Sequence, residues 1–223
     1  MKEVVIICGG ASEPALEQIA SLNEVYQKVW LIGVDRGAWR LVQAGYVLDI
    51  AVGDFDSVDE AERRQIQASS HVFHLLEAEK DDTDMEIGLS LAIQHYPQAD
   101  YVLIGSLGEQ GGRLDHGLCN IWLAHQPRFQ PVLDRLTLVE HHHVGRFYLP
   151  GNYQLVYQPC RYLSIISLTP TKQLQIQGAK YSLKPTDFSY PRALISNEYQ
   201  PTHETVQLSF EEGLVLVFWV NQT

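Results

Sequence analysis

The N-terminal part of the chain alternates short apolar runs with amphipathic stretches, which predicts strands alternating with helices. The apolar runs lie at residues 4–8, 29–34, 50–52, 72–76 and 101–104. Such a βαβ rhythm is typical of a parallel sheet. Helix signals stand between the runs, because Ser57 and Thr83 each begin a capping-box pattern and Gly45 is a stop signal after the stretch 38–44. We therefore expect an α/β domain at the N-terminus.

The pattern changes near Pro131. Short runs rich in Val, Ile, Leu and Tyr follow at residues 136–139, 162–168 and 214–220, separated by Pro and Gly and with little helical periodicity. This pattern predicts strands without helices. We expect two domains, an α/β domain over residues 1–130 and an all-β domain over residues 131–223, with the boundary in the segment 126–131.

Composition and charge restrict the class of protein. With 223 residues, of which 45% are hydrophobic, the chain is long enough to bury a full core and a second, smaller one. Its 16 Lys and Arg residues against 27 Asp and Glu residues give a net charge of -11, which argues against nucleic acid as a partner. Cys8, Cys119 and Cys160 form no close pair, so we expect no disulfide framework, no thiolate metal site and a cytoplasmic location. The apolar run near the N-terminus is too short for a signal peptide or a membrane span, so we expect no membrane association.

Acidic residues gather directly after the predicted strands. They are Asp35, Asp54, Asp56, Asp81, Asp84 and Asp115. In an open parallel sheet, ligands bind beyond the carboxyl ends of the strands, so these side chains can converge on one site. Two unit charges about 4 Å apart repel by ~1 kcal/mol in water and by ~4 kcal/mol at an effective dielectric of about 20, so such a cluster needs a cation. Mg²⁺ suits carboxylate ligands and substrate phosphates, and the pattern therefore predicts phosphate chemistry.

The clusters also have structural interpretations. Asp54 and Asp56 can shape a turn, and Thr83 can cap a helix. The Gly-rich segment 105–113 can bring backbone N–H groups to a phosphate, although it lacks the Gly-Lys-Ser/Thr ending of a Walker A loop. Arg113, as a fork-shaped donor, and Lys80, as a point charge, are candidate phosphate ligands. His116 lies beside the acidic cluster, and its role stays open.

Ordered motifs in both halves of the chain closely resemble the thiamine pyrophosphokinase family. They lie at residues 34–38, 53–57, 80–84, 112–116, 178–183 and 196–198. The resemblance implies an α/β nucleotide-binding domain with a parallel sheet, followed by an all-β sandwich domain. It also implies a homodimer that transfers diphosphate from ATP to the hydroxyl of thiamine, with Mg²⁺ as cofactor and AMP as the second product.

The resemblance further implies roles for individual residues. Mg²⁺ around the ATP phosphates would be bound by Asp54, Asp56 and Asp84, with Asp81 close to them. ATP would be contacted by Lys80, Thr83, Gly111, Gly112 and Arg113, and the catalytic site would be completed by Arg113 and Asp115. Thiamine would lie between subunits, against Tyr181, Ser196 and Asn197 of the β domain and Asp35 of the opposite α/β domain. Asp84 and Asp115 are both candidates for the group that accepts the hydroxyl proton.

Two other functions fit parts of the sequence. Residues 54–58 match the Asp-x-Asp-x-Thr/Val motif of haloacid dehalogenase phosphatases, in which the first Asp attacks phosphorus. That motif normally follows the first strand of its domain, whereas here two predicted strands precede it. A sensor that binds a nucleotide or thiamine without transferring phosphate is the second alternative, and intact Asp clusters argue against it.

Overall fold

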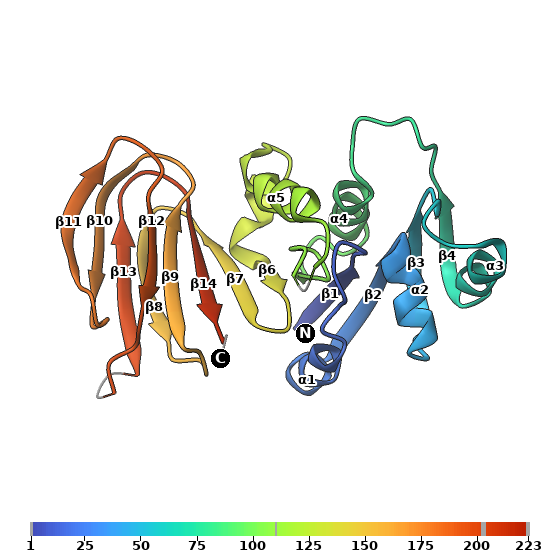
Figure 1. Cartoon of the computed structure of the whole chain (residues 1–223), viewed down its shortest axis with the longest axis horizontal. Coiled ribbons are helices and arrows are strands. Elements are labelled where there is room, and N and C mark those ends of the chain that lie inside the picture. The colour runs from blue at the N-terminus through green and yellow to red at the C-terminus, as the bar shows by residue number, and fades with distance from the viewer. Residues whose placement is uncertain (1, 110, 202–203, 222–223) are drawn as a thin grey trace. The chain divides into compact units, whose positions relative to one another are not determined.

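The structure, a computed structural model, describes residues 2–109, 111–201 and 204–221 and separates into two compact units. Unit 1 comprises Met1–Phe129 and Arg135–His141, and unit 2 comprises Gln130–Asp134 and His142–Thr223. The fold class expected from the sequence is confirmed, since an α/β unit with a parallel sheet is followed by an antiparallel all-β unit. Figure 1 shows both units along the chain.

Unit 1 contains a parallel sheet in the order β6-β5-β1-β2-β3-β4. Its strands are β1 (Glu3–Cys8), β2 (Lys28–Val34), β3 (Leu48–Gly53), β4 (Ser70–Leu75), β5 (Asp100–Ile104) and β6 (Leu136–Val139). The first five coincide with the apolar runs of the sequence. Placing the run 136–139 in the second domain was wrong, because β6 pairs in parallel with β5, with Leu138 opposite Leu103.

Helices cover both faces of this sheet. They are α1 (Glu17–Val25), α2 (Arg36–Gln43), α3 (Glu60–Ala68), α4 (Asp84–His95) and α5 (Leu114–Trp122), followed by the 3₁₀ turn η1 (Leu123–His125). A second 3₁₀ turn, η2 (Gln130–Arg135), belongs to unit 2 except for its last residue. Gly33 of β2 lies against Ala38 of α2, whereas the next residue, Val34, lies against Gly88 of α4. Because successive strand residues point to opposite faces, α2 and α4 pack on opposite sides of the sheet. Burial on both sides explains the apolar runs of β1, β2, β3 and β5.

Two helix starts matter for the site. At α4, Thr83 is the N-cap and forms a full capping box with Glu86, as the sequence predicts. At α3 the predicted start at Ser57 was wrong by two residues, because Asp59 is the N-cap and Glu62 is its partner. The Ser57 hydroxyl instead donates a 2.8 Å hydrogen bond to Asp35 Oδ2, so this side chain serves the site and not the helix.

The sheet order creates a crevice at the carboxyl ends of its central strands. From β1 the chain adds β2, β3 and β4 on one side, and β5 and β6 lie on the other side. The strand that follows β1 in the chain and the strand that follows β5 therefore lie on opposite sides of this pair. Such a reversal is where open parallel sheets bind their ligands. Figure 1 shows β1, β2 and β3 side by side with their arrows directed toward one edge.

Unit 2 is, over the described part of the chain, a sandwich of two antiparallel sheets. One has the order β12-β9-β14-β7 and the other the order β11-β10-β13-β8. The strands are β7 (His143–Tyr148), β8 (Gly151–Val156), β9 (Tyr162–Ser167), β10 (Thr171–Gln177), β11 (Leu183–Phe188), β12 (Ala193–Asn197), β13 (Thr205–Phe210) and β14 (Val215–Val220). Alternate residues from both sheets form one core, which includes Ile165, Ile176 and Val217.

Among the described residues, no helix has the length and apolar character needed to span a membrane.

Candidate active site

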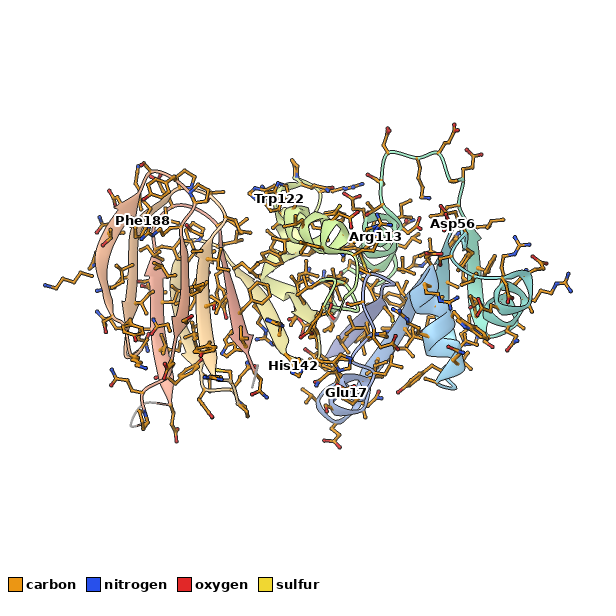
Figure 2. The ribbon with its side chains drawn as sticks, in the orientation of Figure 1. Glu17, Asp56, Arg113, Trp122, His142 and Phe188 are labelled. Atoms are coloured by element: carbon orange, nitrogen blue, oxygen red, sulfur yellow. The ribbon has the colours of Figure 1, made fainter. Side chains whose placement is uncertain are left out.

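A cavity of about 590 Å³ opens at the carboxyl ends of the central strands of unit 1. Its walls come from the loop after β1, the ends of β2 and β3, the start of α4 and one face of α5. The charged residues that line it are Asp35, Arg36, Asp54, Asp56, Asp84 and Arg113, and His116 lies among them. Figure 2 shows Asp56 and Arg113 at the edge of unit 1 toward which the strands of Figure 1 point.

Three carboxylates meet in this cavity. Asp35, Asp54 and Asp84 each offer one oxygen, and these three oxygens lie within 4.8 Å of one another. Each residue is partly exposed, and Asp35 Oδ1 is a buried atom that has no hydrogen-bond partner among the described residues. We call this group the carboxylate trio. A buried and unpaired carboxylate oxygen beside two others is a donor set that fits a hard divalent cation such as Mg²⁺.

The electrostatics of the trio reflect this crowding. Burial raises the pKa of Asp35 above its usual value, and the hydrogen bond from Ser57 only partly opposes the shift. Burial likewise raises the pKa of Asp84, against the effect of Lys80, and the nearby charge of Asp54 adds to the rise. For Asp54, burial acts in the same direction, but the Lys80 ammonium and the backbone N–H of Asp56 together hold its pKa below the usual value. The trio therefore resists carrying three negative charges without a cation.

The backbone of Asp35 has an unusual conformation. Its φ of 48° and ψ of -123° lie in a region that residues other than glycine rarely adopt. The Asp35 N–H donates to Val52 O at 2.9 Å, which directs the residue toward the end of β3. Gly37 allows the following helix to start there, because a Cβ at this position would lie 2.1 Å from Cys8 O. Strained backbone held by surrounding contacts is typical of functional sites.

Some of the other predicted site residues line the cavity and others do not. Asp56 lines the same cavity, is exposed and lies outside the trio. Arg113 also lines the cavity and pairs with Asp115 at 2.6 Å, with both side chains 65% exposed. This guanidinium lowers the pKa of Asp115 to about 2. Asp81 is exposed and, like Asp115, is not among the described residues that line the cavity.

The Gly-rich segment after β5 differs from expectation. The backbone N–H groups of Ser106 and Leu107 do not face a ligand, since each donates a 2.6 Å hydrogen bond to Glu140 Oε1. The N–H of Arg113 donates to Ala11 O at 2.8 Å, and that of Gly112 to Glu109 O at 3.3 Å. Gly111 and Gly112 are exposed and are absent from the described lining of the cavity. These four N–H groups of the segment therefore bond within the protein and not to a phosphate.

Glu140 is the supporting residue that the sequence reasoning missed. It follows β6, its side chain is 1% exposed, and it joins the loops after β1 and β5. Besides the two N–H groups it accepts a 2.9 Å hydrogen bond from the Ser12 hydroxyl. Burial raises the pKa of this carboxyl, although its three hydrogen bonds oppose the rise. The available signal was an acidic residue directly after an apolar run, which is the same signal that marked Asp35.

Of the four predicted thiamine ligands, Asp35 belongs to the trio in unit 1, and the other three lie in unit 2. Tyr181 is 60% exposed, and Ser196 is exposed with a φ of 63°. Asn197 is 4% exposed, and its amide oxygen accepts the N–H groups of Tyr181 at 2.9 Å and of Glu198 at 3.0 Å. Its amide nitrogen donates to Tyr181 O at 2.9 Å. Asn197 thus shapes the turn that presents the Tyr181 ring.

Comparison with known proteins shows the family of this chain. The family described as "Thiamin pyrophosphokinase, catalytic domain" matches residues 22–133, and "Thiamin pyrophosphokinase, vitamin B1 binding domain" matches residues 152–215. The chain is 32% identical over 220 residues to thiamine pyrophosphokinase of Bacillus subtilis (strain 168), which covers 97% of this chain and 98% of that protein. The chain belongs to the thiamine pyrophosphokinase family.

Solved structures of thiamine pyrophosphokinases have the same fold. A thiamin pyrophosphokinase family protein from Enterococcus faecalis superposes with a TM-score of 0.86 at 33% identity, covering 100% of both chains. Thiamine pyrophosphokinase from Bacillus subtilis superposes with a TM-score of 0.81 at 29% identity, also covering 100% of both chains. The family resemblance seen in the sequence motifs is thereby confirmed over the whole chain.

Proposed function

We propose that this protein transfers the diphosphate group of ATP to the hydroxyl of thiamine and releases AMP. The observation that carries the proposal is the carboxylate trio, placed where parallel sheets bind ligands in a chain of the thiamine pyrophosphokinase family. Asp35, Asp54 and Asp84 would hold Mg²⁺, and exposed Asp56, which lines the same cavity, stays a proposed further ligand. Asp81 stays a proposed catalytic residue. When bound, Mg²⁺ supplies positive charge that neutralises phosphate oxygens during transfer.

Other residues in and near the cavity have proposed roles in binding ATP and in orienting the trio. Arg113 is exposed beside the cavity and can turn its fork of donors from Asp115 to a phosphate of ATP. Lys80 would contribute a second positive charge near the trio. Thr83, as the N-cap, orients Asp84 at the first turn of α4. Gly111 and Gly112 stay proposed ATP contacts in the turn that precedes Arg113.

Asp84 and Asp115 both stay candidates for the group that accepts the hydroxyl proton of thiamine. Burial raises the pKa of Asp84 in the metal-free protein, and the Arg113 guanidinium lowers the pKa of Asp115 to about 2 while the two side chains are paired. Mg²⁺ at Asp84 and a phosphate at Arg113 would each change these environments. A carboxylate within hydrogen-bonding reach of the hydroxyl would accept the proton.

Thiamine recognition is proposed for unit 2. The exposed Tyr181 ring can stack on the cationic thiazolium, as aromatic faces attract cations. Lys180 Nζ lies 5.5 Å from the centre of this ring and pairs with Glu198 at 2.6 Å, so the ring already accommodates a cation. Ser196 is an exposed polar contact, whereas Asn197 acts through the backbone of Tyr181. The proposal includes a cytoplasmic homodimer, in keeping with three free cysteines.

The reaction is tested by incubating the purified protein with ATP, Mg²⁺ and thiamine and separating the products by chromatography. Equal amounts of AMP and thiamine diphosphate, lost on adding EDTA, are expected. ADP with thiamine monophosphate would mean a simple kinase. Tight binding of both ligands without product would favour a sensor, and a phosphoaspartate trapped at Asp54 would favour the phosphatase.

A further inference from the structure

The ammonium of Lys80 lies against two members of the carboxylate trio. Lys80 Nζ is 3.1 Å from Asp54 Oδ2 and 3.0 Å from Asp84 Oδ1. All three side chains are largely buried, with 18%, 17% and 18% of Lys80, Asp54 and Asp84 exposed. This is a shielded ion-pair network, unlike a solvent-exposed pair of charged side chains. The lysine therefore neutralises part of the charge that a metal ion would neutralise.

Lys80 and a divalent cation would use the same carboxylate oxygens of Asp54 and Asp84. Mg²⁺ takes oxygen ligands at about 2.0–2.1 Å in a strict octahedral arrangement, which requires the lone pairs that an ammonium engages. A divalent cation among these oxygens would also repel a positive charge held within hydrogen-bonding distance of them. Binding of a divalent cation therefore disfavours the two contacts that Lys80 makes with Asp54 and Asp84.

The position of Lys80 in the chain allows its ammonium to move away from the trio. It lies in the segment between β4 and α4, where residues 76–83 form neither helix nor strand. Besides the two carboxylates, its ammonium donates a 2.9 Å hydrogen bond to Glu77 O within the same segment. The four-carbon stem of lysine is flexible, and its charge is a point and not a planar fork. The ammonium can therefore leave the trio without any change in the sheet.

We propose that Lys80 is a competing counter-ion of the trio, which a divalent cation must displace from Asp54 and Asp84 before it binds. This inference rests on the proposed function, because it takes the trio to be the metal site. Lys80 then lowers the affinity for the free cation and stabilises the protein when cation is scarce. Removing its positive charge tightens cation binding and weakens the cation-free fold.

The test measures binding of Mn²⁺ by titration calorimetry to the full chain, without nucleotide or thiamine. The variants are Lys80→Met and Lys80→Gln, which remove the charge, and Lys80→Arg, which keeps it. Lys172→Met is the matched control, because Lys172 pairs with Glu212 at 2.8 Å in unit 2 with both side chains more than half exposed. It removes the same charge from unit 2, whereas the trio belongs to unit 1.

We expect Lys80→Met and Lys80→Gln to lower the Kd for Mn²⁺ by about fivefold or more, beyond what an exposed ion pair accounts for. Lys80→Arg and Lys172→Met should bind Mn²⁺ as the wild type does. Without cation, the melting temperature of the charge-free variants should fall, and the rise caused by Mn²⁺ should be larger than in the wild type.

Two results would overturn the proposal. Unchanged Mn²⁺ affinity in both charge-free variants would show that Lys80 does not compete, and weaker affinity would show that it supports the metal ligands instead. Either result leaves the trio as the metal site. A wild-type protein that binds no Mn²⁺ would contradict the metal assignment itself, so failure of the two claims is distinguishable.

Discussion

Replacing Glu140 by Ala tests whether one buried carboxylate fixes the loops beside the cavity. The change leaves the N–H of fully buried Ser106 and the hydroxyl of Ser12 without their partner. A buried donor left unsatisfied costs roughly 1–3 kcal/mol, so the two together predict a loss of roughly 2–6 kcal/mol in the free energy of unfolding. The loops after β1 and β5 should also loosen, because Glu140 joins them.

Urea unfolding and hydrogen exchange measure these two effects. The amides of Ser106 and Leu107 should exchange faster in Glu140→Ala, while peptides from unit 2 keep their wild-type protection. Glu140→Gln is the matched variant, since its amide oxygen can still accept both N–H groups, and it should lose less stability than Glu140→Ala. An alanine variant with wild-type stability and wild-type exchange at these two amides would refute the reasoning.

Further predictions concern pH and the helix starts. The folded pKa of Glu140 is raised above 4.5, so its favourable contribution is complete below that pH and is lost as pH rises through the folded pKa. The glutamine of Glu140→Gln cannot ionise, so this variant does not lose that contribution as the pH rises. The difference in unfolding free energy, variant minus wild type, should therefore increase with pH across this window. A difference that does not change with pH would contradict the raised pKa. Gly37→Ala places a Cβ 2.1 Å from Cys8 O and should cost about 1–3 kcal/mol in urea unfolding, together with slower turnover, because α2 and Asp35 must move. Thr83→Ala removes the cap of α4 and should cost about 1 kcal/mol by the same method, and no change would argue against the capping box.

The strands β1, β2, β3 and β5 were predictable because burial on both faces gives each of them an apolar run. The strand β4 ends the sheet order, and none of its residues is fully buried. The strand β6 was assigned to the wrong domain for a physical reason. It has four residues, and its parallel partner β5 ends more than thirty residues earlier, so nothing local to Leu136–Val139 encodes the pairing. A short apolar run looks the same in a parallel and an antiparallel sheet.

The site was predictable in its chemistry but not in its detailed membership. Both Ser57 and Asp59 stand three residues before a Glu, and the chain caps α3 with Asp59 because the Ser57 hydroxyl is bonded to Asp35. Asp54 and Asp84 were expected as metal ligands. Asp35 joins them because its backbone has a positive φ, which no pattern in the sequence predicts. Glu140 escaped notice because its partners are backbone N–H groups distant in sequence.

The central claim is that the carboxylate trio supports diphosphate transfer from ATP to thiamine. Its most direct test is the rate of thiamine diphosphate formation by Asp54→Asn, with Asp187→Asn, an exposed change in unit 2, as the control. The account predicts that Asp54→Asn loses at least about 100-fold in turnover, the scale of losing one electrostatic contact to the transition state, while its circular dichroism stays that of the wild type. A folded Asp54→Asn variant that forms thiamine diphosphate at the wild-type rate would contradict the claim.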